Sequence, residues 1–258
     1  VCKSIIRDFL MKYKLSVVSY LNTIPFIYGL QQSGLHKKLA ISLDIPSTCA
    51  DKLLSDKIDI GLVPIVVLKQ MKNPHIISDF CIGADGEVDT VCLFSDVTIQ
   101  EIESIFLDYQ SKTSVELLKI LLKEYWQVSP KLIEAKANYE QHIKGKKAGL
   151  IIGDRGFQYQ NKFKYVYDLS AIWKAHTGLP FVFACWIANK KIDEDFIKEF
   201  NTALSFGLQN TQKAIDSTAA IYSHCKNPAD YLNNKISYQL DAEKKKGMEL
   251  FLEKNCMY

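Results

Sequence analysis

The sequence predicts an α/β protein with two lobes and a ligand cleft between them. The chain has 258 residues, and 48% of its side chains are hydrophobic, enough for one large domain or two lobes of roughly 100–150 residues. Strand-like and helix-like segments alternate, which is typical of a mostly parallel sheet covered by helices on both faces. Two long apolar runs, at 88–95 and 180–188, bracket the middle of the chain. We expect them to be a pair of strands that cross between the lobes.

The first part of the chain predicts three strand-helix units. Strands are expected at 14–20, 39–45 and 58–65. The helix that follows the first strand, "TIPFIYGLQQ", has Pro25 in its first turn, where the missing N–H costs nothing. The second helix, "PSTCADKLLSDK", offers Ser47 or Thr48 as N-cap. A short helix, "VVLKQM", follows the third strand.

The same alternation restarts after residue 101. Strands are expected at 102–109, 131–135, 148–154 and 165–169. The stretch 111–126, "SKTSVELLKILLKEYW", places its apolar residues on one face of a helix, and 138–147 also reads as helical. The apolar run "LPFVFACWIA" predicts a further long strand. The remainder, from Asp193 on, is expected to be largely helical.

These elements predict a discontinuous first lobe. It comprises residues 11–95 together with 183–258, and the second lobe comprises 96–182. The ligand is expected in the cleft, where sheet strands end and helices begin. Residues 1–10 precede Met11 and the first strand, so we expect this N-terminal extension to be dispensable.

The charge pattern argues against some classes of partner. The net charge is +3 and no basic block marks a nucleic-acid face. No apolar run approaches the ~20 residues of a membrane span, and no signal-peptide pattern is visible, so a cytoplasmic protein is expected. Arg7 and Arg155 are the only arginines. An anionic ligand therefore cannot rely on several guanidinium clamps.

Cysteine and histidine give little support for covalent or metal chemistry. The seven cysteines show no CxxC spacing and are expected to be reduced, mostly buried thiols. Cys49 lies near a helix start, where the dipole lowers a thiol pKa, but no motif supplies a partner for a nucleophile. The five histidines show no ligand spacing. We expect neither a metal nor a cofactor.

Three strand-to-helix joints carry small polar side chains. They are "SYLNT" (19–23), "PSTC" (46–49) and "SKTS" (111–114). Free N–H groups and the helix dipole make such joints anion sites without formal charge; the alternative is that they are ordinary N-caps. The candidate binding residues here are Ser19, Tyr20, Asn22, Thr23, Ser47, Thr48, Ser111, Thr113 and Ser114.

Two further stretches follow expected strands or precede them. "GDRG" places Asp154 and Arg155 at a strand end, where they either face the cleft or form an ion pair that fixes the loop. "HTGLPFVFA" leads into a strand and contributes Leu179, Pro180 and Phe181. Phe181 and Phe183 share one side of that strand, as core residues or as the wall of a pocket. His176 is either a general base or a surface residue.

Seven of these motifs, in order, resemble the chorismate dehydratases of the futalosine route to menaquinone. They are "VSYLNTIPF", "DIPSTCADKL", "DIGLVPI", "GEVDTVCLFS", "LDYQSKTSVELLKILL", "IIGDRG" and "WKAHTGLPFVFACW". The resemblance extends from about Lys14 to Trp186 and implies a lyase with the two-lobed fold of type II periplasmic binding proteins. Thr90 stands where serine is expected, and Gly156 where alanine is common.

The resemblance implies a reaction and its site residues. Chorismate would lose water to give 3-[(1-carboxyvinyl)oxy]benzoate, with Asn22, Thr90 and Asp154 in catalytic roles. The base would be the enolpyruvyl carboxylate of the substrate or Asp154. The sibling enzyme 1,4-dihydroxy-6-naphthoate synthase and a non-catalytic solute-binding protein are the alternatives. The expected partner is the small-molecule substrate alone, bound by a monomer or homodimer.

Overall fold

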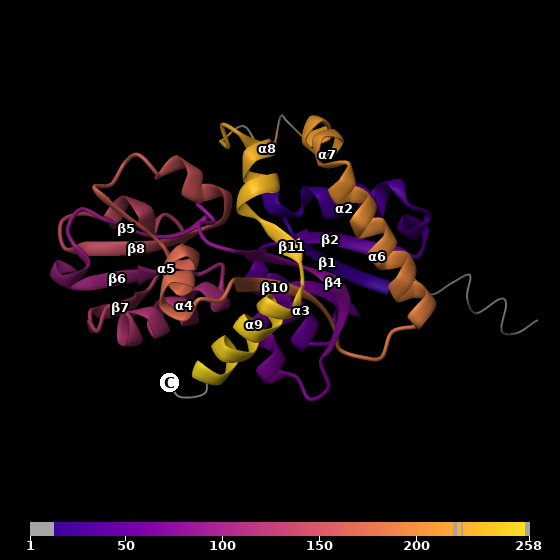
Figure 1. Cartoon of the computed structure of the whole chain (residues 1–258), viewed down its shortest axis with the longest axis horizontal. Coiled ribbons are helices and arrows are strands. Elements are labelled where there is room, and N and C mark those ends of the chain that lie inside the picture. The colour runs from indigo at the N-terminus through magenta and orange to yellow at the C-terminus, as the bar shows by residue number, and fades with distance from the viewer. Residues whose placement is uncertain (1–12, 219–220, 223, 256–258) are drawn as a thin grey trace, which may run out of the picture.

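The computed structural model describes residues 13–218, 221–222 and 224–255. The expected extension 1–10 lies outside this range. The described strands form a six-stranded sheet, in the order β11-β4-β10-β3-β1-β2, and a five-stranded sheet, in the order β7-β6-β8-β5-β9. Figure 1 shows the two sheets next to each other, with the second on the left. The two-sheet α/β fold predicted from the sequence is confirmed.

The first sheet combines parallel and antiparallel strands. Its strands are β1 (Tyr13–Val18), β2 (Leu39–Asp44), β3 (Ile60–Pro64), β4 (His75–Ala84), β10 (Phe181–Ala188) and β11 (Ser237–Gln239). β1 runs parallel to β2 and β3, whereas β10 lies antiparallel between β3 and β4. The expectation of a mostly parallel sheet is therefore right only for β1 to β3. β4 was not expected, because the polar pair Ser78 and Asp79 interrupts its apolar pattern.

The second sheet repeats this plan. Its strands are β5 (Val91–Ser95), β6 (Ser104–Leu107), β7 (Lys131–Glu134), β8 (Lys147–Ile152) and β9 (Tyr165–Asp168). β6 runs parallel to β7 and β8, and β5 lies antiparallel between β8 and β9. The run 88–95 is expected in the first lobe, but its strand pairs in the second sheet. The chain thus passes from the first sheet to the second before residue 91. Apart from this shift of the first boundary, the proposed division into lobes stays a prediction.

Helices and helical turns connect the strands. The longer ones are α2 (Ile24–Gln32), α3 (Pro46–Leu54), α4 (Lys112–Glu124), α5 (Leu169–Thr177), α6 (Glu194–Gln209), α7 (Thr211–Thr218) and α9 (Ala242–Lys254). The shorter ones are η1 (Leu21–Thr23), η2 (Gly34–Lys37), η3 (Ile65–Gln70), η4 (Ile99–Glu101), η5 (Tyr139–His142), η6 (Gly153–Gln158), α8 (Pro228–Asp230) and the π-helix η7 (Tyr231–Lys235). None of the helices among the described residues is long and apolar enough to cross a membrane.

Helix α5 was not expected from the sequence. The Asp168 carboxylate caps it by accepting from the N–H groups of Ser170 and Ala171, and Gly178 ends it in the left-handed conformation (φ 74°). His176 thus lies in the last turn of a helix. Its Nε2 is 3.2 Å from Glu124 Oε2 and it does not line the cavity described below, which favours the surface role over that of a general base.

Helices α2 and α6 touch along their backbones (Figure 1). A Cβ atom on Gly207 would lie 1.8 Å from the carbonyl oxygen of Pro25, and one on Gly29 would lie 2.0 Å from that of Ala203. Both obstacles are main-chain atoms, so neither can rotate away. This close approach fixes α2, and with it the polar turn that precedes α2, against the C-terminal part of the chain.

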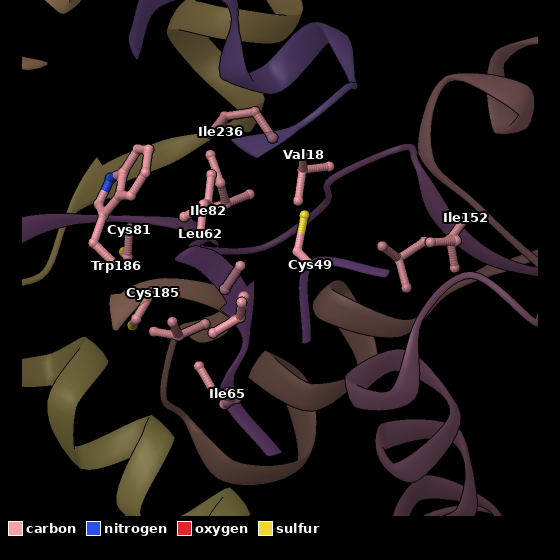
Figure 2. Packing of buried hydrophobic residues seen from close by; sticks show 14 of the residues in the cluster. Val18, Cys49, Leu62, Ile65, Cys81, Ile82, Ile152, Cys185, Trp186 and Ile236 are labelled. Carbon is pink, nitrogen blue, oxygen red and sulfur yellow. The ribbon is translucent and has the colours of Figure 1, made fainter. Parts of the chain in front are cut away.

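The core of the first sheet contains most of the described thiols. Figure 2 shows Cys81 and Cys185 on neighbouring strands beside Trp186, with Cys49 directed toward Val18. The described cysteines are free and buried, as expected. Burial raises the pKa of Cys49 to about 11, and the Ser16 hydroxyl donates to its sulfur at 3.1 Å. The bond from Ser16 lowers this pKa, but burial has the larger effect. A nucleophilic Cys49 is therefore disfavoured, because the reactive form is the thiolate.

Candidate active site

A cavity of about 50 Å³ lies between the two sheets, where the parallel strands end. Its walls come from β1 and η1, the ends of β3 and β8, the starts of α3 and α4, β4, β10 and the segment before β5. The lining residues are Val18, Tyr20, Asn22, Pro46, Pro64, Ile82, Val88, Thr90, Val91, Ser111, Ser114, Ile152, Gly153, Phe183 and Ala184. None of them carries a formal charge. This position is the usual ligand site of open α/β folds.

The first polar joint directs Asn22 to the cavity and uses Thr23 for its own structure. The Thr23 hydroxyl donates to the carbonyl oxygens of Val18 (2.6 Å) and Tyr20 (2.8 Å) and is fully buried. Neither η1 nor α2 has a side-chain N-cap. The alternative that Asn22 caps a helix is therefore wrong, and Thr23 closes the turn instead of lining the site. Ser19, which follows β1, does not line the cavity either.

The second joint differs from the expectation. Helix α3 begins at Pro46 after Ile45, without a side-chain cap, so Ser47 and Thr48 are not N-caps. Pro46 lines the cavity, whereas the N–H of Ser47 donates to the carbonyl oxygen of Gln110 at 3.0 Å. This joint therefore contacts the second sheet through its main chain.

The third joint matches its expectation more closely. Ser111 caps α4 by accepting from the N–H of Ser114 at 3.2 Å, and the two hydroxyls are 3.0 Å apart. Both residues line the cavity. Thr113 does not, although its buried hydroxyl has no hydrogen-bond partner among the described residues. The N-terminus of α4 thus presents two hydroxyls and a helix dipole to the cavity.

Thr90 faces the cavity beside a tyrosine that the sequence did not indicate. Its Oγ1 lies 2.9 Å from the hydroxyl of Tyr231 and 3.3 Å from the carbonyl oxygen of Val88. A second tyrosine, Tyr238, donates from its hydroxyl to the carbonyl oxygen of Asn22 at 2.9 Å. Both tyrosines come from the C-terminal part of the chain, which the sequence pattern predicts to be largely helical.

Asp154 links the two sheets at the edge of the site. Both of its carboxylate oxygens accept from the N–H of Leu21, at 3.1 and 3.0 Å. Burial raises the pKa of Asp154 to about 7, and the bond from Leu21 partly offsets this. Asp154 is not among the lining residues, whereas its neighbour Gly153 is. Gly153 is left-handed (φ 66°), and a Cβ atom there would meet the ring of Tyr20 at 2.6 Å.

Arg155 is held by carboxylates of its own chain. Its guanidinium donates to Asp108 and to Glu140, each at 2.5 Å, and lies over the ring of Tyr109. It does not line the cavity. This arrangement fits the alternative of a loop-fixing ion pair, and a substrate carboxylate would have to compete with both acidic groups.

The segment before β10 contributes less than expected. Phe181 is buried against Trp173 and Phe251, and Pro180 lies under α9, where a Cβ atom on Gly247 would be 2.2 Å from its carbonyl oxygen. Neither these two residues nor Leu179 lines the cavity, whereas Phe183 does. Among the described residues, no group of three or more His, Cys, Asp or Glu could hold a metal ion.

The raised pKa of Asp154 makes stability depend on pH. The folded protein keeps this proton up to about pH 7, whereas an unfolded chain loses it near pH ~3.9. Between these two pH values the folded state binds more protons than the unfolded state. Stability therefore falls as pH rises from ~3.9 to about 7, and this part of the stability stays lost at higher pH. Asp154→Asn removes the titration and can still accept from Leu21. We expect its melting temperature to rise relative to that of the parent between pH 5 and 8.

Thermal melts at several pH values test this expectation. The control is Asp195→Asn, which removes a carboxylate with an 85% exposed side chain. If the melting curves of Asp154→Asn and of the parent shift in parallel across this range, Asp154 does not titrate there.

Comparisons with known proteins identify relatives of this chain. The sequence model of the family described as "Menaquinone biosynthesis" matches residues 13–255. A chorismate dehydratase from Thermus thermophilus is 29% identical over 192 residues, which cover 67% of this chain and 69% of that protein.

Solved structures support the fold. A protein from Archaeoglobus fulgidus superposes with a TM-score of 0.74 at 14% identity, covering 95% of this chain and 97% of its own. A gene product of Candida albicans, described as having the generic periplasmic binding protein fold, gives 0.67 at 13% identity, covering 96% and 91%. The chain has a periplasmic-binding-protein-like fold, and by the family match over 13–255 it belongs to the menaquinone biosynthesis family.

Proposed function

We propose that this protein is a chorismate dehydratase that eliminates water from chorismate to give 3-[(1-carboxyvinyl)oxy]benzoate. Family membership and the relative from Thermus thermophilus support a role in menaquinone biosynthesis. The observation that carries the specific reaction is the cavity itself. It brings Asn22, Thr90 and the hydroxyls at the start of α4 together, with no charged side chain in its lining.

Uncharged donors suit the first step of this elimination. A proton leaves the ring carbon that bears the enolpyruvyl ether, and hydroxide leaves the neighbouring carbon. Negative charge develops on the ring carboxylate, which is conjugated to the reacting carbon. Hydroxyl and amide donors aimed at that group would act as an oxyanion hole. We propose that Ser111, Ser114 and the first N–H groups of α4 supply them, because both serines line the cavity at the start of this helix.

The proposed base is the enolpyruvyl carboxylate of chorismate. The cavity lining offers amide and hydroxyl groups, which are poor bases near neutral pH. Asp154 is the second candidate, because its pKa of about 7 suits proton transfer. Its carboxylate, however, is held by the N–H of Leu21 and is not part of the lining. The substrate carboxylate is therefore the stronger proposal.

Substrate entry would require the sheets to separate. About 50 Å³ has room for a few water molecules and not for a ring with two carboxylates. The contacts to be broken join the first sheet to the second: Leu21 to Asp154, the hydroxyl of Tyr20 to Gln110, and Lys112 to Asp51 at 2.9 Å. The N–H of Ser47, which donates to the carbonyl oxygen of Gln110 at 3.0 Å, and the packing of Phe157 on Tyr231 also join the two sides of the cavity.

Incubation with chorismate tests the proposed function. We expect an aromatic carboxyvinyl ether to form without added metal or cofactor, detected by its absorbance and mass. Neither 1,4-dihydroxy-6-naphthoate synthase nor a solute-binding protein should make that product. If no product forms while the protein is folded, the proposal fails. Asp154→Asn should retain turnover within about tenfold if the substrate supplies the base, and lose far more if Asp154 does. The cytoplasmic location and the monomeric or dimeric state stay predictions.

A further inference from the structure

The hydroxyl of Tyr231 lies behind Thr90 in the wall of the cavity. Tyr231 is 3% exposed and Thr90 is 2% exposed. Their oxygens are 2.9 Å apart, although the residues are far apart in the sequence. The ring of Tyr231 packs edge-to-face on Phe157, with centroids 5.0 Å apart. These contacts hold the phenol in one place.

Tyr231 also begins the π-helix η7. Such turns are rare and are often found at functional sites. This one places Tyr231 beside Thr90 and Asn22. Burial raises the pKa of Tyr231, and side-chain hydrogen bonds with Thr90 and Asn22 oppose this effect. Burial keeps the phenol neutral, so it retains a hydrogen to donate.

The direction of the hydrogen bond decides what Thr90 can do. A threonine hydroxyl has one hydrogen and two lone pairs. If Tyr231 donates to Thr90, the hydrogen of Thr90 is left with only the 3.3 Å contact to the carbonyl oxygen of Val88. It can then turn to a substrate oxygen in the cavity. A hydroxyl that accepts one hydrogen bond is also a better donor of the next.

We propose that Tyr231 is a positioning residue, whose hydroxyl donates to Thr90 Oγ1 and so directs the Thr90 hydrogen into the cavity. This inference rests on the proposed function, in which Thr90 donates to the substrate. The hydrogen bond from Thr90 to the substrate strengthens as negative charge develops on the leaving hydroxide or on the ring carboxylate. Tyr231 therefore acts on the transition state through Thr90 and makes no contact with the substrate.

Kinetics of single and double variants test this role. Tyr231→Phe removes one oxygen and should lower kcat about tenfold, the scale of one hydrogen bond, with KM within about twofold. Thr90→Val removes the threonine hydroxyl at nearly constant shape and should lower kcat further. If Tyr231 acts only through Thr90, the double variant should be no slower than Thr90→Val alone. Thr90→Ser keeps a hydroxyl for Tyr231 to hold and should restore kcat to within about threefold of the parent.

The matched control is Tyr139→Phe. Tyr139 is also 3% exposed, and its hydroxyl contacts the Asp108 carboxylate at 2.9 Å and the carbonyl oxygen of Leu150. None of these three residues lines the cavity. Its loss should lower the melting temperature without changing kcat. Independent losses in the double variant, or a Tyr231→Phe protein that is unfolded while Tyr139→Phe is folded, would overturn the inference. A folded parent that leaves chorismate unchanged would instead refute the proposed function, and the two failures are thus distinct.

Discussion

The substitution Asn22→Asp is expected to lower turnover of chorismate at least ~100-fold, the scale of one lost oxyanion donor, about 2.7 kcal/mol. Asn22 lines the cavity and caps no helix, so stability gives no reason for the loss. The added carboxylate would face a substrate with two negative charges in a site whose described lining carries no formal positive charge to offset it. It would also replace an amide donor with an acceptor.

The control for this charge change is Asn227→Asp. Asn227 caps α8 by accepting from the N–H of Asp230 at 3.1 Å, and aspartate caps a helix as well as asparagine does. It does not line the cavity. We expect this variant to keep parental kcat and KM. If Asn22→Asp is folded by circular dichroism and still dehydrates chorismate within a few-fold of the parent, Asn22 does not contact the substrate in the way proposed.

The second large effect is expected on stability. Gly207→Ala should lower the free energy of unfolding by at least ~2 kcal/mol, because its Cβ atom would lie 1.8 Å from the carbonyl oxygen of Pro25. The clash is with main chain, so α2 and α6 must move apart. Because η1 precedes α2 directly, the shift should also displace Asn22 and reduce activity. Urea denaturation monitored by tryptophan fluorescence measures the first effect.

Gly34→Ala is the matched control, because nothing lies within 4 Å of the Cβ position at Gly34. We expect Gly34→Ala to change the free energy of unfolding by less than ~1 kcal/mol. The change is an increase if the substitution mainly reduces the conformational entropy of the unfolded chain. Equal urea midpoints of unfolding for Gly207→Ala and Gly34→Ala would mean that α2 and α6 can move apart where they cross without loss of stability.

The local patterns that could be predicted from the sequence were those set by neighbouring residues. Pro25 in the first turn of α2 and the hydroxyl cap of Ser111 depend on a few adjacent positions. The sequence predicts the first directly and offers the second as the alternative to an anion site. Ser47 and Thr48 show the limit of such reasoning. Pro46 itself begins α3, so the cap position falls on Ile45. A set of capping residues near a helix start does not say which position the main chain uses.

What could not be predicted depends on contacts between distant parts of the chain. No pattern near residue 231 indicates that its hydroxyl reaches Thr90, and the pKa of Asp154 depends on burial between the sheets. The sequence leaves open whether Arg155 faces the cleft or forms an ion pair, because its carboxylate partners, Asp108 and Glu140, are 47 and 15 positions away. The resemblance supplied Thr90, whereas the phenol that holds it came only from the fold.

The order of strands in the first sheet has a consequence for synthesis. The second sheet uses the continuous stretch 91–168, whereas the first sheet needs β10 between β3 and β4 and receives β11 near the end of the chain. As the chain leaves the ribosome, the second sheet is complete first, while β3 and β4 wait with unpaired edges. β3 is buried along its whole length in the finished protein. Until β10 arrives, it therefore exposes apolar side chains next to unpaired main-chain N–H and C=O groups, which can pair with other chains. The nascent protein is therefore most exposed to aggregation, and most in need of a chaperone, in the interval between the synthesis of β4 and that of β10.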